Sequence, residues 1–321
     1  MCQIDRKVDL KSPLVSILIP CYNSEKFIGE AIRSAFHQSY SQLEVIVVDD
    51  GSTDESLACA KRLKNNNFPD LIVLSHPDRA NYGVSTSRYR AFMEASGKYV
   101  AFLDADDQFE LEKIEKQVML LQQFPDVVLC HTGITVFGDQ SQVSAHEGYF
   151  GRYPAEPYNF RQCSDYLRRN RICNSSVMVK TDILRKVPFA MPQLFQYEDW
   201  ICWSLVSAHG KFIFLDEKLT RYRIHGKSAT AAVMQNPLRE QYSLLEFKLA
   251  LVVKSESLGH SLKCLFSAGQ TLLNIMWRYM MVSPYPLSEK LQSPNLLSRF
   301  WQRAVSIKRS IFNRKARLKK Q

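Results

Sequence analysis

The chain has 321 residues, of which 45% are hydrophobic and 23% charged, a composition typical of a globular protein with one or two domains. Its net charge of +10 arises in residues 290–321, which hold ten Lys or Arg and no acid, while the other 289 residues contain 32 basic and 32 acidic groups. The body of the protein therefore lacks the basic excess of a nucleic-acid-binding protein, and no nucleic-acid partner is expected. Eight scattered cysteines without a C-x-x-C pair argue against a zinc site and a disulfide framework.

Apolar runs and helical patterns alternate through the first 123 residues. The runs predict strands buried on both faces, and the segments between them carry apolar residues at helical spacing. Ser52 and Glu55 have the spacing of a capping box at the start of a helix. The alternation predicts a doubly wound, mostly parallel α/β sheet with flanking helices. The expected strands are 14–20, 43–48, 71–74 and 99–103, and the expected helices are 24–36, 53–64, 85–95 and 110–123.

Three carboxylates, Asp104, Asp106 and Asp107, follow the apolar run that ends at Leu103. Ligands of open α/β sheets bind outside the carboxyl ends of the strands. Alternate residues of an extended chain point the same way, so Asp104 and Asp106 can converge on one cation. Two carboxylates and substrate phosphates are typical ligands of Mg²⁺, and Mn²⁺ is the other candidate. The alternative is an acidic turn that caps the helix expected from Glu110.

Two further loops lie at carboxyl ends of expected strands: IPCYNSE after the first and VVDDGSTDE after the second. Neither contains G-x-G-x-x-G or G-x-x-x-x-G-K-S/T, which disfavours a dinucleotide dehydrogenase and a P-loop kinase. They offer instead an aromatic ring (Tyr22), an amide (Asn23) and two acids (Asp49 and Asp50). This set suits a pyrimidine nucleoside diphosphate whose base packs on tyrosine. The alternatives are a core position for Tyr22 and helix capping by one of the two acids.

Five segments in fixed order resemble the family 2 glycosyltransferases, which have the GT-A fold. They are VSILIPCYNSEKFIGEAIRSAFHQSY, LEVIVVDDGSTDES, NYGVSTSRYRAFMEASGKYVAFLDADD, YEDWICWSL and YRIHGKSAT, and the resemblance covers residues 14 to 228. It implies transfer of a sugar from a nucleotide-diphosphate donor, with UDP-sugars favoured, to an acceptor hydroxyl with inversion at the anomeric carbon. The sequence departs from the family at Tyr89, where asparagine is usual, and at Pro188 and Phe189, where a Gly-Gly-Phe segment is customary.

The resemblance also implies a role for each matching residue. A turn histidine and a solvated helix arginine are the alternatives for His225 and Arg88. The implied roles are base and ribose binding by Pro20, Tyr22 and Glu25, contact with a uracil-like ring by Asp49 and Asp50, diphosphate binding by Arg88, nucleotide-sugar binding by Asp104 and Glu198, metal binding by Asp104, Asp106, Asp107 and His225, and general-base catalysis by Asp199.

The sequence predicts four regions. They are an N-terminal extension (1–13), a nucleotide-sugar-binding half (14–107), an acceptor-binding half of the same domain (108–229) and a helical, basic extension (230–321). The expected acceptor is a growing glycan or a lipid-linked saccharide. Two rival functions are a sugar-phosphate nucleotidyltransferase, which would need a glycine-rich loop where PCYNSE has none, and an inactive binding module of the same fold.

Residues 296–321 place apolar side chains at helical spacing among basic ones. We expect a basic amphipathic helix that lies on an anionic membrane surface, and the alternative is a helix packed on the protein. The polar amino terminus does not resemble a signal peptide, and no run of 18 apolar residues predicts a transmembrane helix. The expected location is cytoplasmic and peripheral on the inner face of the membrane.

Overall fold

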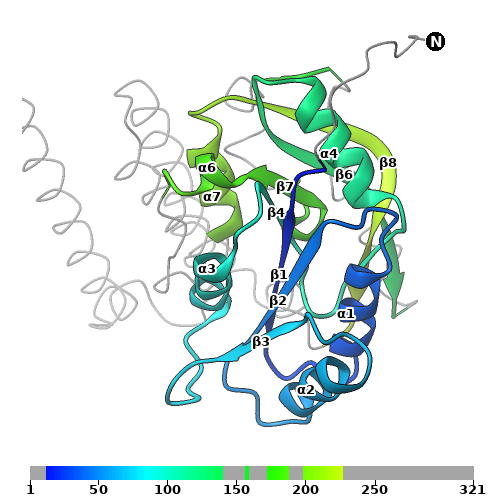
Figure 1. Cartoon of the computed structure of the whole chain (residues 1–321), viewed down its shortest axis with the longest axis vertical. Helices are drawn as coiled ribbons and strands as arrows, with labels where there is room; N and C mark the ends of the chain where they lie inside the picture. Colours follow the sequence, from blue (N-terminus) through cyan, green and yellow to red (C-terminus); the bar gives the residue numbers. More distant parts are fainter. Residues whose placement is uncertain (1–11, 140–155, 159–171, 188–197, 227–321) are drawn as a thin grey trace, which may run out of the picture. The chain divides into compact units, whose positions relative to one another are not determined.

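The computed structural model describes residues 12–139, 156–158, 172–187 and 198–226, which form one sheet with helices around it (Figure 1). The chain divides into two compact units, Met1–Ala231 and Ala232–Gln321. The expected helical extension (230–321), its basic helix (296–321) and most of the N-terminal extension (1–13) lie outside the described residues. Within the described residues, no helix is long and apolar enough to cross a membrane.

The first half of the sheet is parallel, as the sequence predicts. Continuous apolar runs form its strands because both of their faces are covered, and β1, β4 and most of β2 are buried. β1 pairs with β2 on one side and β4 on the other, and β3 extends the sheet beyond β2. The elements are β1 (Val15–Cys21), α1 (Ile28–Phe36), β2 (Leu43–Asp49), α2 (Ser56–Asn66), β3 (Ile72–Ser75), α3 (Val84–Glu94) and β4 (Tyr99–Phe102).

The second half adds strands of both directions, so the eight-stranded sheet has the order β3-β2-β1-β4-β7-β6-β8-β5. β7 lies antiparallel between β4 and β6, and β8 is parallel to β6. The elements are β5 (Gln108–Phe109), α4 (Lys113–Gln123), β6 (Val127–Gly138), the 3-10 turn η2 (Asn174–Ser176), β7 (Val177–Lys180), α6 (Thr181–Leu184), α7 (Glu198–Val206) and β8 (Lys211–Ile224).

The direction of each strand decides which loops share an edge of the sheet. Since β7 opposes β4, the residues just before β7 lie at the edge where β4 ends. β6 is antiparallel to β7 and β8 is parallel to β6, so the carboxyl end of β8 also lies at that edge. Three segments that are far apart in the sequence therefore meet beside the carboxyl ends of β1 and β2. They are the loop after β4, η2, and the end of β8 with the residues that follow it.

The expected capping box is wrong. α2 begins at Ser56, and its N-cap Glu55 makes no side-chain capping bond. The Ser52 hydroxyl instead accepts the Asn23 N–H at 3.0 Å, from the loop after β1. α1 likewise begins four residues later than expected, because residues 24–27 form a turn in which the Phe27 N–H donates to the Ser24 carbonyl at 2.9 Å. The polar residues of the two loops bind each other, and Asp54 in addition accepts the Ser56 N–H at the start of α2 at 3.0 Å.

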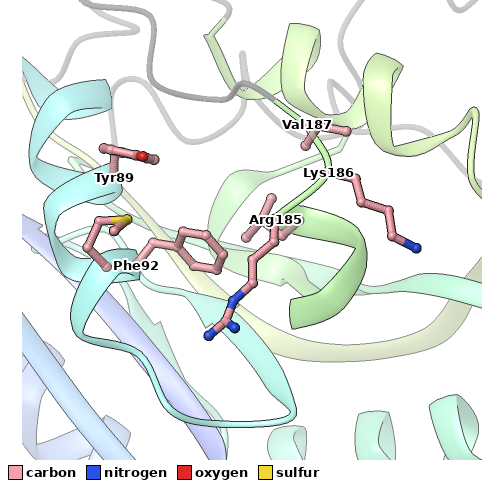
Figure 2. Close-up of a pocket in the computed structure, with 7 residues that line it drawn as sticks. Tyr89, Phe92, Arg185, Lys186 and Val187 are labelled. Atoms are coloured by element: carbon pink, nitrogen blue, oxygen red, sulfur yellow. The ribbon is translucent and has the colours of Figure 1, made fainter.

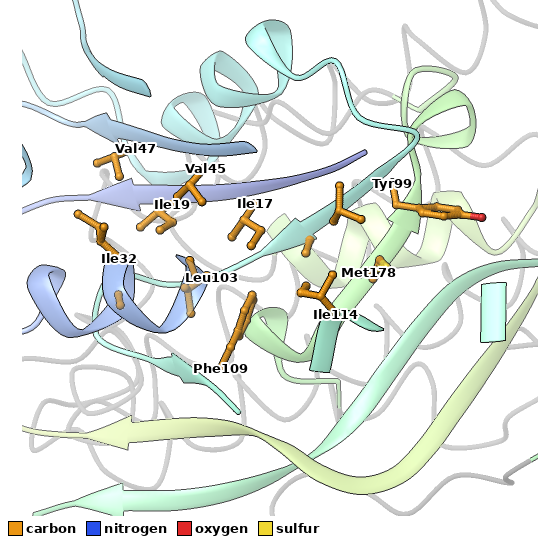
Figure 3. Packing of buried hydrophobic residues seen from close by; sticks show 14 of the residues in the cluster. Ile17, Ile19, Ile32, Val45, Val47, Tyr99, Leu103, Phe109, Ile114 and Met178 are labelled. Carbon is orange, nitrogen blue, oxygen red and sulfur yellow. The ribbon is translucent and has the colours of Figure 1, made fainter. Parts of the chain in front are cut away.

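The core lies between this sheet and the helices on one of its faces (Figure 3). Ile17, Ile19 and Val45 of the central strands are buried with Ile32 of α1 and Ile114 of α4. Full burial of each such side chain contributes about 1.5–3 kcal/mol. The loops at the carboxyl edge are thus mounted on strands that packing holds in place.

Candidate active site

The loops after β1 and β2 are joined by a set of short polar contacts. The Glu25 N–H donates to Asp54 Oδ2 and the Glu55 N–H donates to Glu25 Oε2, both at 3.1 Å. Gly51, in the loop after β2, has a φ of +75°. A side chain there would meet the Arg79 carbonyl at 2.5 Å, so only glycine fits. Pro20 is buried in β1, whereas the ring of Tyr22 is 48% exposed beside it. The core alternative for Tyr22 is wrong, and its ring is open to a ligand.

Asp49 is the last residue of β2 and Asp50 follows it. Both are buried, but they have different hydrogen-bond partners. Asp49 accepts the Ser52 N–H at 3.2 Å through Oδ2, and its buried Oδ1 has no hydrogen-bond partner in the described part of the chain. Asp50 Oδ1 accepts the Tyr82 N–H at 2.8 Å and lies 3.3 Å from His76 Nε2. The His76 and Tyr82 rings are 4.8 Å apart, and Tyr82 is half exposed. Tyr82 is thus a second exposed tyrosine, fixed to the acid that was expected to face the base.

Arg88 of α3 joins the loop after β4 to the start of α7. Its Nη2 lies 2.7 Å from Asp104 Oδ1, and its Nη1 lies 2.6 Å from Glu198 Oε1. Burial lowers the pKa of the Arg88 guanidinium, but the two carboxylates outweigh burial and raise that pKa above its usual value. The solvated alternative for Arg88 is wrong, because the side chain is a buried cation between two acids.

The acids after β4 form a turn rather than an extended segment. The Asp107 N–H donates to the Asp104 carbonyl at 3.0 Å. Asp104 also accepts from Asn174 Nδ2 at 3.1 Å, and Asp106 Oδ2 lies 3.0 Å from His225 Nε2. None of these acids caps α4, which begins at Lys113 and whose Ile114 N–H donates to Gln38. The capping alternative is wrong, and the turn presents Asp104 and Asp106 at the sheet edge.

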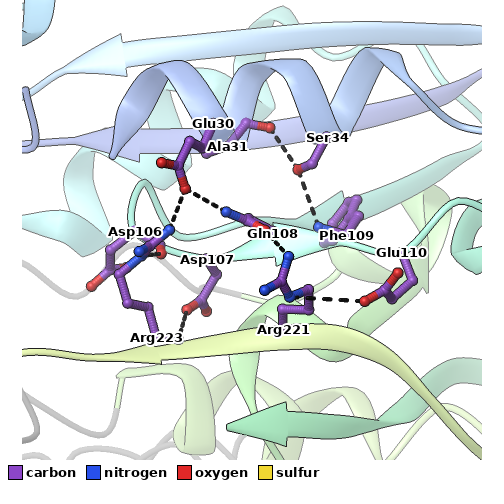
Figure 4. Close-up of polar contacts among 10 residues, drawn as sticks. All are labelled: Glu30, Ala31, Ser34, Asp106, Asp107, Gln108, Phe109, Glu110, Arg221 and Arg223. Carbon is purple, nitrogen blue, oxygen red and sulfur yellow. Dashed lines mark hydrogen bonds and ion pairs between the residues drawn. The ribbon is translucent and has the colours of Figure 1, made fainter. Parts of the chain in front are cut away.

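Asp107 faces inward and is fully engaged by the protein. Its Oδ2 accepts the Ser175 hydroxyl at 2.5 Å, and its Oδ1 accepts the Arg223 N–H at 2.8 Å, as Figure 4 shows for the second bond. Burial, with the negative charges of Asp106 and Asp104, raises the pKa of the Asp107 carboxyl well above its usual value. An acid held in this way anchors the turn from inside.

Arg223 of β8 fastens the same turn from the other side (Figure 4). Its Nε donates to the Asp106 carbonyl at 2.8 Å, and its Nη2 forms an ion pair with Glu30 of α1. The guanidinium carbon also lies 4.7 Å from the centroid of the Phe27 ring, which in turn packs against the His225 ring at 4.7 Å. One arginine therefore connects α1, the acidic turn and the residues after β8.

The site fits a divalent cation that takes some of its ligands from a substrate. Asp106 and His225 lie side by side with side chains about a quarter exposed. In the described ranges, no three His, Cys, Asp or Glu side chains gather into a group that could hold an ion alone. Mg²⁺ commonly binds through one or two carboxylates and the phosphates of a substrate, so the carboxylates of Asp104 and Asp106 suit it better than the imidazole of His225.

Glu198 and Asp199 begin α7, where the positive end of the helix favours acids. Asp199 Oδ1 accepts the Trp200 N–H at 2.7 Å, within its own first turn. Trp200 and Trp203 are buried, and the Trp203 ring lies 5.2 Å from that of Phe102 in β4. The tryptophans pack α7 against the sheet. This packing places the carboxylate of Asp199 near the ion pairs of Arg88.

A family model, Glycosyl transferase family 2, matches residues 16–187, which is more than half of the chain. The chain belongs to this family. It is a glycosyltransferase, as its sequence motifs predict. A curated relative from Haemophilus influenzae, described as an uncharacterized glycosyltransferase, is 28% identical over 222 residues, which are 68% of this chain and 68% of that protein.

Two solved glycosyltransferases share the fold of this enzyme. TarS residues 1–349 of S. aureus, in complex with UDP-GlcNAc, has a TM-score of 0.63 at 19% identity and covers 90% of this chain and 81% of its own. The mannosyltransferase PcManGT of Pyrobaculum calidifontis, in complex with GDP-Man and Mn²⁺, has a TM-score of 0.56 at 16% identity and covers 93% and 85%. These likenesses confirm the predicted GT-A-type α/β fold.

The glycosyltransferase also has a cavity of about 670 Å³, and Figure 2 shows the residues that line it. It is lined by Tyr89, Phe92 and Met93 of α3 and by residues 184–187 at the end of α6. Thr181, the first residue of α6, donates to the carbonyls of Gly97 and Lys98, which precede β4. The cavity therefore lies towards the amino end of β4, opposite the edge that carries the acids.

Several residues at the site were not among those expected from the sequence. Asn174, Ser175 and Arg223 contact the acidic turn, and His76 and Tyr82 contact Asp50. Tyr82 belongs to the motif segment that begins NYGVSTSRYR, so the sequence could have indicated it as a site residue. Asn174 and Ser175 gave none, because only the antiparallel pairing of β7 brings them to this edge.

Proposed function

We propose that the enzyme transfers a sugar from a UDP-sugar to a hydroxyl of a growing glycan or lipid-linked saccharide, with inversion and with help from Mg²⁺ or Mn²⁺. The observation that carries the proposal is the double ion pair of Arg88. It ties Asp104, on the loop expected to bind the donor, to Glu198, the residue before the expected base. The same arginine thus pairs with an acid of the proposed donor site and with the acid next to the proposed base.

The nucleoside part of the donor is proposed to bind beside the loops after β1 and β2. Pro20, Tyr22, Glu25, Asp49 and Asp50 remain the proposed contacts, and an exposed ring beside two acids supports a pyrimidine base. The related structures carry both possibilities, since TarS is described with UDP-GlcNAc and PcManGT with GDP-Man. The ring N–H of uracil can donate to such a carboxylate, and so can that of guanine, so the choice of UDP over GDP rests on the family resemblance and on the screen described below.

The diphosphate is proposed to bind where Arg88, Asp104, Asp106 and His225 meet. Asp106 and His225 are the proposed ligands of the cation, and Asp104 the proposed contact of the ribose and the cation. A bound cation supplies electrostatic stabilisation of the departing diphosphate. The buried, fully bonded state of Asp107 supports an anchoring role for this acid in place of the expected ligand role.

Asp199 is proposed as the general base. Its carboxylate takes the proton of the acceptor hydroxyl as that oxygen attacks the anomeric carbon. The bond from this carbon to the diphosphate oxygen breaks on the opposite face, and its electron pair leaves with the diphosphate, so the configuration inverts. General-base assistance contributes about 100- to 10,000-fold.

Residues 14–107 are proposed to bind the donor and residues 108–229 the acceptor. The contacts of η2 and β8 residues with the acidic turn add acceptor-half side chains to the proposed donor site. The basic residues 296–321 are proposed to hold the enzyme on the inner face of the cytoplasmic membrane, close to a lipid-linked acceptor. The composition of this segment is the support for that location.

The test is a screen of nucleotide-sugars with the full-length enzyme and Mn²⁺, in which release of the free nucleoside diphosphate is measured. We expect slow release of UDP from one UDP-sugar, faster release with the acceptor present, and loss of both with EDTA. Formation of a nucleotide-sugar from UTP and a sugar phosphate would instead indicate a nucleotidyltransferase. Binding of UDP-sugars without any release would indicate an inactive module.

A further inference from the structure

The turn η2 holds the acidic turn at its back. Because β7 runs antiparallel to β4, the residues that precede β7 face the residues that follow β4. Ser175 is completely buried there and Asn174 nearly so. Gln117 Nε2 of α4 donates to the Ser176 carbonyl at 3.0 Å, so α4 also helps to hold η2 in place. The turn is a rigid support and not a loose connection.

The hydroxyl of Ser175 makes two bonds to the acidic turn at once. It accepts the backbone N–H of Asp104 at 3.0 Å and donates to Asp107 Oδ2 at 2.5 Å. A hydroxyl has one donor and two acceptor positions, so it can do both. An alanine in its place would leave a buried N–H and a buried carboxyl oxygen without these partners, which is unfavourable for both groups.

The second of these bonds extends to Asp106. Asp107 passes the restraint on through Oδ1, which accepts the Arg223 N–H at 2.8 Å, and Arg223 Nε donates to the Asp106 carbonyl at 2.8 Å. One end of the chain of contacts therefore fixes the backbone of Asp104, and the other fixes the backbone of Asp106. One buried hydroxyl is therefore connected to the backbones of both partly exposed acids.

We propose that Ser175 is a positioning residue for the donor diphosphate and its divalent cation. It acts through Asp104, and through Asp107 and Arg223 on Asp106, and it does not contact the ligand. This inference rests on the proposed function, because it assigns Ser175 to the same donor site. Groups that orient metal ligands from behind typically affect metal affinity or activity by about 10- to 100-fold.

Ser176 offers a matched control in the same turn. It too is completely buried, and its hydroxyl donates to the Cys173 carbonyl at 2.6 Å, within η2 itself. The described contacts of its side chain do not include the acidic turn. Removal of either hydroxyl should loosen η2, but only removal of the Ser175 hydroxyl should release the acids.

The experiment measures binding of UDP and Mn²⁺ to full-length wild type, Ser175→Ala and Ser176→Ala by calorimetry, with the thermal midpoint of each as the folding control. We expect Ser175→Ala to bind UDP in the presence of Mn²⁺ about 10- to 100-fold more weakly, and Ser176→Ala within about threefold of wild type. The midpoint of Ser175→Ala should fall further, because this variant loses two buried bonds whereas Ser176→Ala loses one, so the affinities are compared at a temperature well below both midpoints. If Ser175→Ala does not fold, Ser175→Cys takes its place, since a thiol is a weak hydrogen-bond partner of nearly the same size.

The wild-type measurement separates the two proposals. If wild type binds UDP with Mn²⁺ and the Ser175 variant binds as tightly as the Ser176 variant, the positioning role is overturned and the proposed donor site stands. If wild type binds neither UDP nor GDP with Mn²⁺, the donor-site proposal and the positioning role both fail.

Discussion

The proposed nucleoside side of the site (Asp49 and Asp50) and its proposed diphosphate side (Asp104 and Asp106) hold their carboxylates in different ways. Asp49 and Asp50 are 2% and 3% exposed, and backbone N–H groups of nearby loops bind them. The side chains of Asp104 and Asp106 are 28% and 27% exposed, and groups from α3, η2 and the end of β8 hold them. Acids of the first kind also hold their loops in place, whereas acids of the second kind are more open to ligands. Substitutions on the two sides should therefore differ in whether they affect folding or turnover.

The largest effect is expected for Asp199→Asn, next to the diphosphate side. The amide keeps the shape of the side chain but cannot take a proton, so the transfer rate should fall by about 100- to 10,000-fold. UDP affinity and the thermal midpoint should stay close to those of wild type. Asp182→Asn, at an exposed acid in the first turn of α6, is the control. Loss of UDP binding in Asp199→Asn would assign this residue to the donor site instead.

Asp106→Asn should lower the transfer rate by about 100- to 1,000-fold, the usual cost of removing one group that stabilises charge in the transition state. The Mn²⁺ concentration for half-maximal rate should rise, while the free energy of unfolding in urea should hardly change. Asp126→Asn removes an exposed ion-paired acid elsewhere and should affect neither. Near-normal turnover of Asp106→Asn in Mn²⁺ would contradict the ligand assignment and the contrast between the two sides.

Asp50→Ala should show the opposite pattern. The variant leaves the Tyr82 N–H without its acceptor at a partly buried place and removes the carboxylate beside His76, which keeps its contact with the Ser87 hydroxyl, so the free energy of unfolding should fall by about 1–3 kcal/mol. UDP binding should weaken as well, because Tyr82 loses its fixed position. Asp70→Ala, at an exposed position, should leave the urea midpoint unchanged. A fully stable Asp50→Ala protein would show that the nucleoside-side acid does not brace its loop.

The smallest effect is expected for Ser52→Ala. Its hydroxyl accepts the Asn23 N–H at an exposed place, so UDP affinity should fall by about twofold to fivefold and stability by no more than about 0.5 kcal/mol. Ser39→Ala, which removes an exposed hydroxyl bonded to Glu115, is the control in calorimetry and urea unfolding. A loss of about 1 kcal/mol would instead be the size of a helix-capping contribution and would restore the expected capping role.

The same contrast explains what the sequence could and could not predict. β1, β2 and β4 lie within one or two residues of their expected bounds because strands buried on both faces have continuous apolar sequences. Tyr22 and Asp50 could be found from their position just after such strands. The inward orientation of Asp107 could not, because it depends on Ser175 and Arg223, whose approach is fixed by strand pairing and not by local pattern.

The antiparallel insertion of β7 also has a consequence for the order in which the protein is made. The Ser175 hydroxyl binds Asp104 across 71 positions, and His225 reaches Asp106 across 119. At roughly 5–20 residues per second, a ribosome needs about 4–14 s to extend the chain from the first acid to that serine. During this interval β4 pairs with β1 on one side only, so Tyr99–Phe102 is an unprotected apolar edge. The strand that brings Ser175 to the acidic turn is thus also the one that ends the nascent chain's exposure to edge-to-edge aggregation.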